Sequence, residues 1–140
     1  MSPAPLVTYR PVDWSTLVAF LTTQIAVAHK DIDHDVRRLT YKAFCEAQVV
    51  EGIYRAGTEE MVGFVLWDTD NGHLRNLYVS PAARGLGIAS DFLKSHPIET
   101  LQVMPGNSAA IELYRRHGFV ITTVVVPNRH LMWRNLASAA

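Results

Sequence analysis

The chain has 140 residues, 49% of them hydrophobic, and its 13 basic and 13 acidic residues give a formal net charge of zero. A chain of this length can bury about two thirds of its unfolded surface, so we expect residues 1–140 to form a single domain without a disulfide or a structural metal. Zero net charge excludes a general electrostatic attraction to nucleic acid or to an anionic membrane, and we expect neither as a partner.

Two further features bear on the compartment. Residues 1–6 carry no cationic segment followed by an apolar run, and no stretch approaches the ~18 apolar residues of a membrane span, so we expect a cytoplasmic protein. The single cysteine, Cys45, has no partner for an internal disulfide. It falls in the apolar pattern of a predicted helix, and we expect it to be a small buried hydrophobic residue.

The N-terminal third predicts one strand and two amphipathic helices. Residues 7–11 form a short strand candidate, and Asp13 can cap the helix that follows. A second helix begins near Asp33, and both helices must cover a sheet or each other. Apolar residues repeat at helical spacing in both: Trp14, Leu17, Val18, Leu21 and Ile25 in the first, and Val36, Leu39, Ala43 and Phe44 in the second.

The connection between these helices, residues 29–35, contains three aspartates and two histidines. Acids at a helix start mainly cap the helix and interact with its dipole, which is the interpretation we favour. Two alternatives stay open: an acidic rim that attracts a cationic amine, and a metal site. We predict no metal. A second short connection, residues 127–130, is too short to interpret.

The pattern then changes to that of strands. Residues 49–55, 61–67 and 73–79 are rich in β-branched and aromatic residues, and they are separated by turn sequences at 56–59 and 70–72. This arrangement predicts an antiparallel meander.

The segment after the third strand predicts an anion site. Residues 84–89 read Arg-Gly-Leu-Gly-Ile-Ala and open a helix that stops by Pro97. The start of a helix presents unpaired N–H groups and the positive end of the helix dipole. Gly85 and Gly87 allow the main chain to approach a phosphate closely. The segment lacks the third glycine of a dinucleotide fold and the Lys-Ser/Thr of a P-loop, which excludes both.

The remaining elements complete the chain in order. A strand at 100–104 is followed by a helix at 108–117, which Gly118 closes, and by strands at 119–125 and 130–134.

A second motif lies downstream of the glycine loop. It reads Asn-x-x-Ala-x-x-Leu-Tyr-x-x-x-Gly-Phe, with Asn107, Tyr114 and Phe119 among its fixed positions. From about Leu74 to Phe119 the chain closely resembles the acetyl-CoA-binding half of the GNAT N-acetyltransferases. The resemblance implies an α/β (α+β) fold, with a mixed, mostly antiparallel sheet of six to seven strands flanked by four helices and splayed between its two central parallel strands.

The resemblance also implies acetyl-CoA as cofactor and assigns residues to it. Asn107 lies at the mouth between the splayed strands, where it can bind pantetheine or a water, although a helix cap is an equal alternative. The helix after the glycine loop has room for only about two turns, which leaves the phosphate site at its first turn intact. The diphosphate is assigned to the glycine loop and the pantetheine arm to the strand before it: Arg84, Gly85, Leu86, Gly87, Ile88 and Ala89, and Leu77, Tyr78 and Val79.

Catalysis needs a proton donor and a proton acceptor. The family pattern directs Tyr114 at the sulfur of coenzyme A, so we expect Tyr114 to be the general acid, the alternative being a core tyrosine. His73 occupies the place where the family often has a glutamate, and it is our candidate base, the alternative being a turn residue without function. Weaker candidates are Glu46, Glu51 and His34.

The sequence therefore predicts an N-acetyltransferase that moves an acetyl group from acetyl-CoA directly to a primary amine of a small molecule or peptide, in a ternary complex. No nucleophile with a partner falls in the motifs, so no covalent intermediate is expected. The alternatives are an acyl-CoA-binding regulatory module and a partner-binding subunit without productive catalysis. A homodimer is one open option for the oligomeric state.

Overall fold

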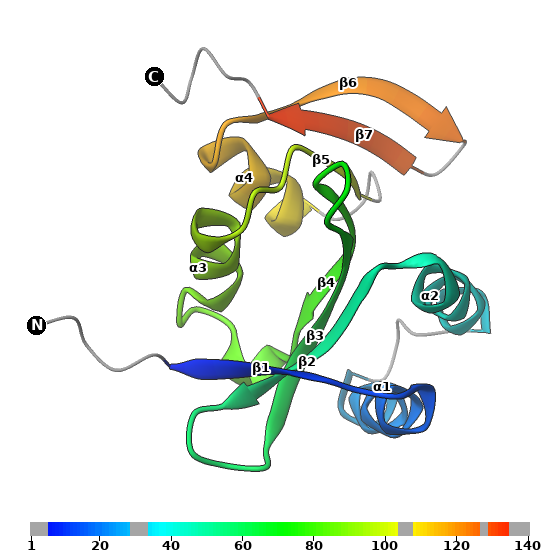
Figure 1. The fold of residues 1–140 in the computed structure, drawn as a ribbon, viewed down its shortest axis with the longest axis vertical. Helices are drawn as coiled ribbons and strands as arrows, with labels where there is room; N and C mark the ends of the chain where they lie inside the picture. Colours follow the sequence, from blue (N-terminus) through cyan, green and yellow to red (C-terminus); the bar gives the residue numbers. More distant parts are fainter. Residues whose placement is uncertain (1–5, 29–33, 104–107, 127–128, 135–140) are drawn as a thin grey trace, which may run out of the picture.

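The computed structural model describes residues 6–28, 34–103, 108–126 and 129–134, with the backbone alone for 25–28, 34–39, 121–126, 129–131 and 133–134. The elements follow in the order predicted from the sequence (Figure 1). They are β1 Val7–Pro11, α1 Trp14–Ala28, α2 His34–Glu46, β2 Val49–Arg55, β3 Met61–Asp68, β4 His73–Val79, η1 Pro81–Ala83, α3 Ile88–Ser95, β5 Thr100–Val103, α4 Ser108–Arg116, β6 Phe119–Val126 and β7 Arg129–Arg134.

The strands form one mixed sheet. Its seven strands, within the described residues, run in the order β1-β2-β3-β4-β5-β7-β6. β4 and β5 are parallel, and the other neighbouring pairs are antiparallel. This confirms the predicted meander and the predicted mixed, mostly antiparallel sheet.

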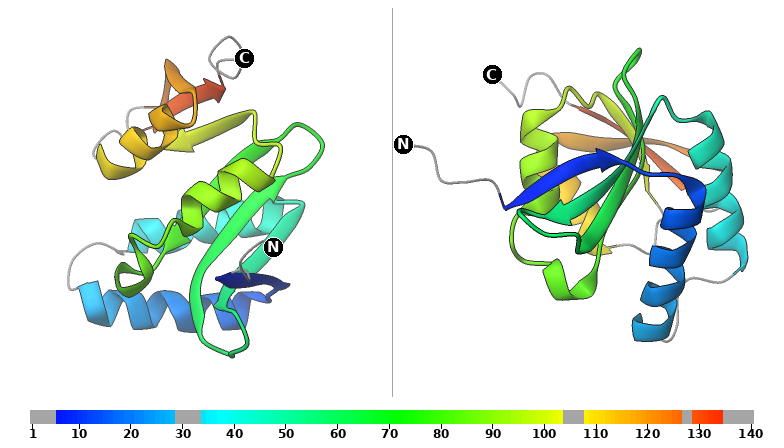
Figure 2. Two further views of the ribbon diagram at one scale, coloured as in Figure 1. Left: turned by 90° about the vertical axis from the view of Figure 1, so that its left-hand side faces the viewer. Right: turned by 60° about the horizontal axis from the view of Figure 1, so that its bottom comes forward.

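The sheet parts between its two parallel strands. β4 and β5 pair only at His73 with Thr100 and at Leu74 with Leu101. β4 then continues to Val79 beside β3, while β5 continues beside β7. Figure 2 shows β5, β7 and β6 turning away from the plane of β1 to β4. The described sheet therefore has the splay expected between the central strands.

Helices cover both faces of the sheet, α1 and α2 on one and α3 and α4 on the other (Figures 1 and 2). β3 is buried from Val62 to Asp68, so its residues pack alternately toward the two layers. Phe64 and Leu66 pack with Leu17 and Phe20 of α1. Val65 and Trp67 join the cluster that contains Phe92 of α3 and Ile111 of α4. A strand covered on both faces reads as a continuous apolar run, as residues 61–67 do.

Local sequence signals account for several element boundaries. Asp13 Oδ1 accepts the Thr16 N–H at 2.8 Å, which confirms the predicted cap of α1. That hydrogen bond lowers the pKa of the Asp13 carboxyl. Gly57 and Gly72 take positive φ angles of 76° and 64° in the two turns of the meander. The helix after the glycine loop, α3, has eight residues, or about two turns.

The prediction for Cys45 is wrong, because this cysteine is exposed. On α2, Ala43 and Phe44 are the residues that pack against the α1 cluster. Cys45 follows Phe44 by one position, about 100° around the helix, which turns it away from the sheet. The sequence prediction placed Cys45 on the buried face of the helix because cysteine is an apolar residue type and its spacing is close to that of the buried positions.

No helix among the described residues combines the length and the apolar character that crossing a membrane requires.

Candidate active site

The end of β4 presents open main-chain groups to the splay. The Ser80 N–H donates to Val62 O at 2.8 Å, so the main-chain groups of Ser80 face β3. Since these groups alternate along a strand, those of Val79 and Leu77 face the opposite side, where β5 has diverged. Arg84 Nε donates to Val79 O at 3.0 Å, in agreement with this direction.

The glycine loop turns the chain from this strand edge into α3. Gly85 and Gly87 have φ angles of 83° and 81°, and Gly87 is the N-cap residue of the helix. A Cβ at either glycine would meet no atom within 4 Å, so the backbone angle, not crowding, is what demands glycine here. The first bond of the helix is Asp91 N–H to Gly87 O at 2.8 Å, and the N–H groups before Asp91 have no acceptor within the helix.

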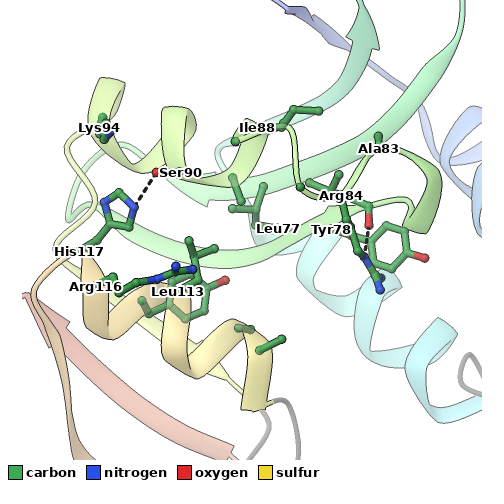
Figure 3. A pocket seen from close by; sticks show the side chains of 17 residues that line it. Leu77, Tyr78, Ala83, Arg84, Ile88, Ser90, Lys94, Leu113, Arg116 and His117 are labelled. Carbon is green, nitrogen blue, oxygen red and sulfur yellow. Dashed lines mark hydrogen bonds between the residues drawn. The ribbon is translucent and has the colours of Figure 1, made fainter.

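A pocket of about 770 Å³ connects the strand edge, the glycine loop and both helices of this face (Figure 3). Such a volume lies within the range of small-molecule and cofactor sites. Its lining comes from four segments: Leu77, Tyr78 and Val79; Ala83, Arg84, Gly85 and Gly87; Ile88, Ala89, Ser90 and Lys94; and Ala109, Ala110, Leu113, Tyr114, Arg116 and His117.

Tyr114 is the buried titratable group of this pocket. Its side chain is 6% exposed, and its ring packs edge-on against Phe119 at a centroid distance of 6.2 Å. Burial raises the pKa of its phenol to about 12. At neutral pH Tyr114 is therefore protonated and can donate a hydrogen bond.

Tyr78 sends its ring to the opposite face of the sheet from the helices of the pocket. The ring stacks on Phe64 at 5.8 Å, and its hydroxyl donates to Gln24 Oε1 of α1 at 3.1 Å. Burial raises the pKa of this phenol, and the nearby Arg84 guanidinium opposes the shift. Tyr78 thus links the rim of the pocket to the α1 layer.

The pocket is cationic along α3 and α4. Arg84, Lys94 and Arg116 line it, and no carboxylate is among its lining residues. Ser90 Oγ and His117 Nε2 lie 2.8 Å apart and tie the two helices together (Figure 3). Within the described residues, no three histidines, cysteines or carboxylates are grouped closely enough to hold a metal ion.

His73 lies at the closed end of the splay, and it is not among the residues that line the pocket. Its Nδ1 is 2.7 Å from Thr100 Oγ1 of β5. Burial, helped by the Arg75 charge and opposed by Asp68, lowers the pKa of its imidazole. His73 is four residues before Leu77, or about 13 Å along β4.

The weaker base candidates are also outside the pocket lining. Glu46 Oε2 accepts Arg75 Nη1 at 2.8 Å. Glu51 lies on β2, which β3 and β4 separate from β5. The side chain of His34 lies outside the described residues.

The structure brings most of the sequence-predicted cofactor residues together, since Leu77, Tyr78, Val79, Arg84, Gly85, Gly87, Ile88, Ala89 and Tyr114 all line the pocket. Leu86 is the exception: it is 48% exposed on the loop and does not line the pocket. Asn107 lies outside the described residues, as do residues 29–33 and 127–128 of the two connections.

Sequence reasoning missed Ser90, Lys94, Arg116 and His117. Helical spacing held a signal for some of them. Ser90 and Lys94 are four residues apart on α3, and His117 follows Tyr114 by three, so each pair shares a helix face. Extending the predicted site from the two motifs along those helix faces would have included Ser90, Lys94 and His117.

Three solved structures show the same fold. Ard1 from Thermoplasma volcanium is 20% identical, covers 93% of this chain and 97% of its own, and has a TM-score of 0.61. Arabidopsis thaliana Naa50, in complex with the bisubstrate analogue CoA-Ac-MVNAL, is 19% identical with 94% and 99% coverage and a TM-score of 0.59. A spermidine N-acetyltransferase chimera of Vibrio cholerae SpeG and hSSAT is 16% identical, with 96% and 98% coverage and a TM-score of 0.60.

A comparison with curated proteins finds no match. The profile of the acetyltransferase (GNAT) domain, in contrast, matches residues 42–121, which is more than half of the chain and includes the glycine loop and Tyr114. The chain therefore belongs to the GNAT acetyltransferase family.

Proposed function

We propose that this protein transfers an acetyl group from acetyl-CoA directly to a primary amine, in a ternary complex of enzyme, cofactor and acceptor. The observation that carries the proposal is the parting of β4 from β5 beside a glycine loop, with the buried Tyr114 lining the same pocket. An extended arm that carries amides can pair with the open edge at Leu77 and Val79, as a strand would.

The diphosphate of the cofactor is assigned to the start of α3. There the N–H groups of the first turn and the helix dipole point at one place, and charge-assisted hydrogen bonds of this kind are worth about 1.5–3 kcal/mol each. Arg84 holds Val79 O through its Nε, and a terminal nitrogen of the same guanidinium can bind a phosphate.

Tyr114 is proposed as the general acid for the departing thiolate. Proton transfer from a phenol of pKa about 12 to the thiolate of a thiol with a pKa near 8.5 is uphill by roughly 5 kcal/mol in the ground state. The burial that raises the pKa of Tyr114 also raises the pKa of a thiol bound beside it, so the difference between the two pKa values becomes smaller. Tyr114 therefore acts first as a hydrogen-bond donor to the developing negative charge and gives up its proton late in the reaction.

His73 is proposed as the base that takes a proton from the acceptor ammonium. Its lowered pKa keeps the imidazole neutral at pH 7, which is the form that accepts a proton. Its place at the closed end of the splay requires that the proton reach it through water.

The acceptor is proposed to be an amine of a small molecule or a peptide. Among the structures that share the fold, Naa50 is in complex with the bisubstrate analogue CoA-Ac-MVNAL, and the SpeG chimera is a spermidine N-acetyltransferase. The fold therefore accommodates acceptors of both classes, which supports a panel that includes each.

The test is a measurement of free thiol released from acetyl-CoA over a panel of polyamines, aminoglycosides, amino acids and peptides. We expect release to depend on one class of amine and to fall strongly in Tyr114→Phe. Tight binding of acetyl-CoA with no turnover of any amine would instead establish an acyl-CoA-binding regulatory module.

A further inference from the structure

Each of the two strands that part at the splay presents a carboxamide to the α1–α2 side of the sheet. On β4, Asn76 pairs with Leu66, whose side chain packs in the α1 cluster, so the Asn76 side chain lies on that face. On β5, both strand neighbours of Gln102 belong to the core cluster beneath α3 and α4, so Gln102 also points to the α1–α2 side. The last pair of β4 with β5, Leu74 with Leu101, comes just before them. The two amides therefore flank the opening between the strands.

The reactive end of the proposed cofactor lies next to Asn76. The diphosphate is assigned to the glycine loop, which follows Val79, so the arm runs back along β4 and its thioester end lies nearest Leu77. Asn76 directly precedes Leu77, and neither Asn76 nor Gln102 lines the cofactor pocket. Since the cofactor fills the α3–α4 side, an acceptor reaches the thioester from the α1–α2 side, where both amides lie.

The charged groups beside Asn76 are already paired. Arg75, the residue before it, donates to Asp68 and to Glu46, each at 2.8 Å. Helix α1, which packs on Leu66, contains no charged residue. Among the described residues, no hydrogen bond joins the Asn76 amide to another side chain or to the main chain. The described part of this face thus offers neutral hydrogen-bonding groups to an amine.

We propose that Asn76 and Gln102 hold the acceptor between them, and that the acceptor is an α-amino group next to a carbonyl, as in an amino-acid amide or at the end of a peptide. This inference rests on the proposed acetyl transfer and narrows its acceptor. The Asn76 oxygen accepts a hydrogen bond from the attacking nitrogen, and the Gln102 amide nitrogen donates one to the carbonyl. A lysine side chain or a polyamine has no carbonyl at this position.

The basicity of the amine favours the same class of acceptor. An α-amino group has a pKa of about 7.7–8.0, whereas that of a lysine side chain is about 10.4, and a neutral amide stabilises an ammonium less than a carboxylate does. His73, the proposed base, precedes Leu74 of the cluster beneath α3 and α4, so it faces the α1–α2 side as well. Burial lowers the pKa of His73, so it takes a proton at a smaller cost in free energy from an α-ammonium than from a lysine ammonium.

Thiol release at saturating acetyl-CoA tests the proposal on the full chain with three probes: alanine amide, Nα-acetyl-lysine amide and spermidine. We expect the wild type to prefer alanine amide by at least about tenfold in kcat/KM. Asn76→Ala and Gln102→Ala should each raise the KM for alanine amide by about tenfold, the loss of roughly one hydrogen bond, with an unchanged Kd for acetyl-CoA. Gln102 is exposed, so its variant tests the assignment without disturbing the core.

Asn76→Asp is a sharper variant, because it changes the charge and keeps the shape. A carboxylate stabilises an ammonium, so the preference for alanine amide should fall by about tenfold or more. Asn71→Asp is the matched control, since it adds the same charge in the turn before β4. There Asn71 Oδ1 accepts the His73 N–H, which a carboxylate oxygen can also accept, and the variant should keep the full preference.

Each contrary result has a distinct meaning. A wild type that acetylates the lysine probe or spermidine as well as alanine amide overturns the acceptor class and leaves the proposed function standing. An unchanged KM in both alanine variants overturns the assignment of the two amides. Binding of acetyl-CoA without turnover of any amine, in these probes and in the wider panel, overturns the proposed function and the acceptor assignment with it.

Discussion

Arg84 and Val79 are joined by a hydrogen bond from Arg84 Nε to the Val79 carbonyl oxygen, at 3.0 Å. The bond ties the first residue of the glycine loop to the last residue of β4. The guanidinium carbon of Arg84 also lies 5.6 Å from the centre of the Tyr78 ring. One side chain thus holds the strand edge, covers an aromatic ring and faces the pocket that the loop lines.

Arg84→Lys tests this double use of the guanidinium. A lysine keeps the charge, but its single ammonium cannot hold Val79 O and a phosphate in the same arrangement. We expect the Kd for acetyl-CoA to rise by about tenfold, the loss of roughly one charge-assisted hydrogen bond. Titration calorimetry measures the change, and a Kd within a factor of two of wild type would show that charge alone is sufficient.

Gly87→Ala tests the backbone requirement of the loop. Gly87 has a φ of 81° and open space around its Cα, so alanine brings strain without a clash. Strain of this kind costs about 1–2 kcal/mol. We expect that loss in the free energy of unfolding, measured with urea, together with weaker binding of acetyl-CoA.

Gly57→Ala is the matched control for this variant. Gly57 has a similar φ of 76°, also in open space, but it lies in the turn between β2 and β3. It should lose the same stability and keep its affinity for acetyl-CoA. A loss of affinity in both variants would assign the effect to general destabilisation.

Much of the fold could be predicted because local signals agreed with the periodicity. Asp13, Gly57 and Gly72 mark a cap and two turns, and each has the expected geometry in the structure. The alternation of β-branched and aromatic residues between these signals left few other choices for the meander.

The face on which each residue of β4 packs could not be predicted, because β4 contains a bulge. Leu66 pairs with Asn76 and Trp67 with Leu74, so Arg75 is the extra residue. Leu74 and Leu77 both pack against the α3–α4 cluster, although a spacing of three would place them on opposite faces of a regular strand. Periodicity cannot reveal such a bulge, because it depends on pairing between strands.

The candidate site was predictable where motifs are contiguous and not where helices meet. The glycine loop and Tyr114 each belong to a local motif. The contact between Ser90 and His117, in contrast, spans 27 residues and depends on how α3 and α4 pack. A motif shows which residues share a segment, whereas contacts between segments require the tertiary structure.

Tyr114→Phe tests the proposed acid. We expect kcat to fall by roughly 10²-fold or more, as for removal of a general acid, while the Kd for acetyl-CoA changes little, because the ring that packs on Phe119 is kept. Since burial holds the pKa of Tyr114 at about 12, the wild-type rate should show no alkaline fall from this phenol below about pH 11. Stopped assays of thiol release across pH measure both effects. If kcat instead stays within about threefold of the wild-type value, the loss is far smaller than removal of a general acid causes, and Tyr114 is a packing residue.

His73→Asn tests the proposed base. Asparagine can keep a hydrogen bond to Thr100, which separates proton acceptance from the link between β4 and β5. Burial lowers the pKa of His73, so in the wild type kcat/KM should fall only as the pH drops below about 6.5, where the imidazole becomes protonated. The variant should lose this acid limb and roughly 10²-fold in kcat. An unchanged pH profile would assign the limb to another group and leave His73 as a structural link.

Arg75→Ala tests how the bulge of β4 is held against α2. Arg75 Nε donates to Asp68 Oδ2, and Arg75 Nη1 donates to Glu46 Oε2, each at 2.8 Å. The Asp68 side chain is only 10% exposed, so loss of the arginine leaves a buried carboxylate that still accepts the Gln48 N–H but has lost its counter-charge. We expect the free energy of unfolding to fall by about 2 kcal/mol, less than for a fully buried pair.

Arg55→Ala is the comparison for this ion pair. Arg55 and Glu60 are also 2.8 Å apart, but their side chains are 44% and 59% exposed. An exposed pair of this kind contributes less than about 1 kcal/mol, so the variant should unfold at nearly the wild-type urea concentration. Equal losses in the two variants would show that burial of Asp68 does not govern the strength of its pair with Arg75.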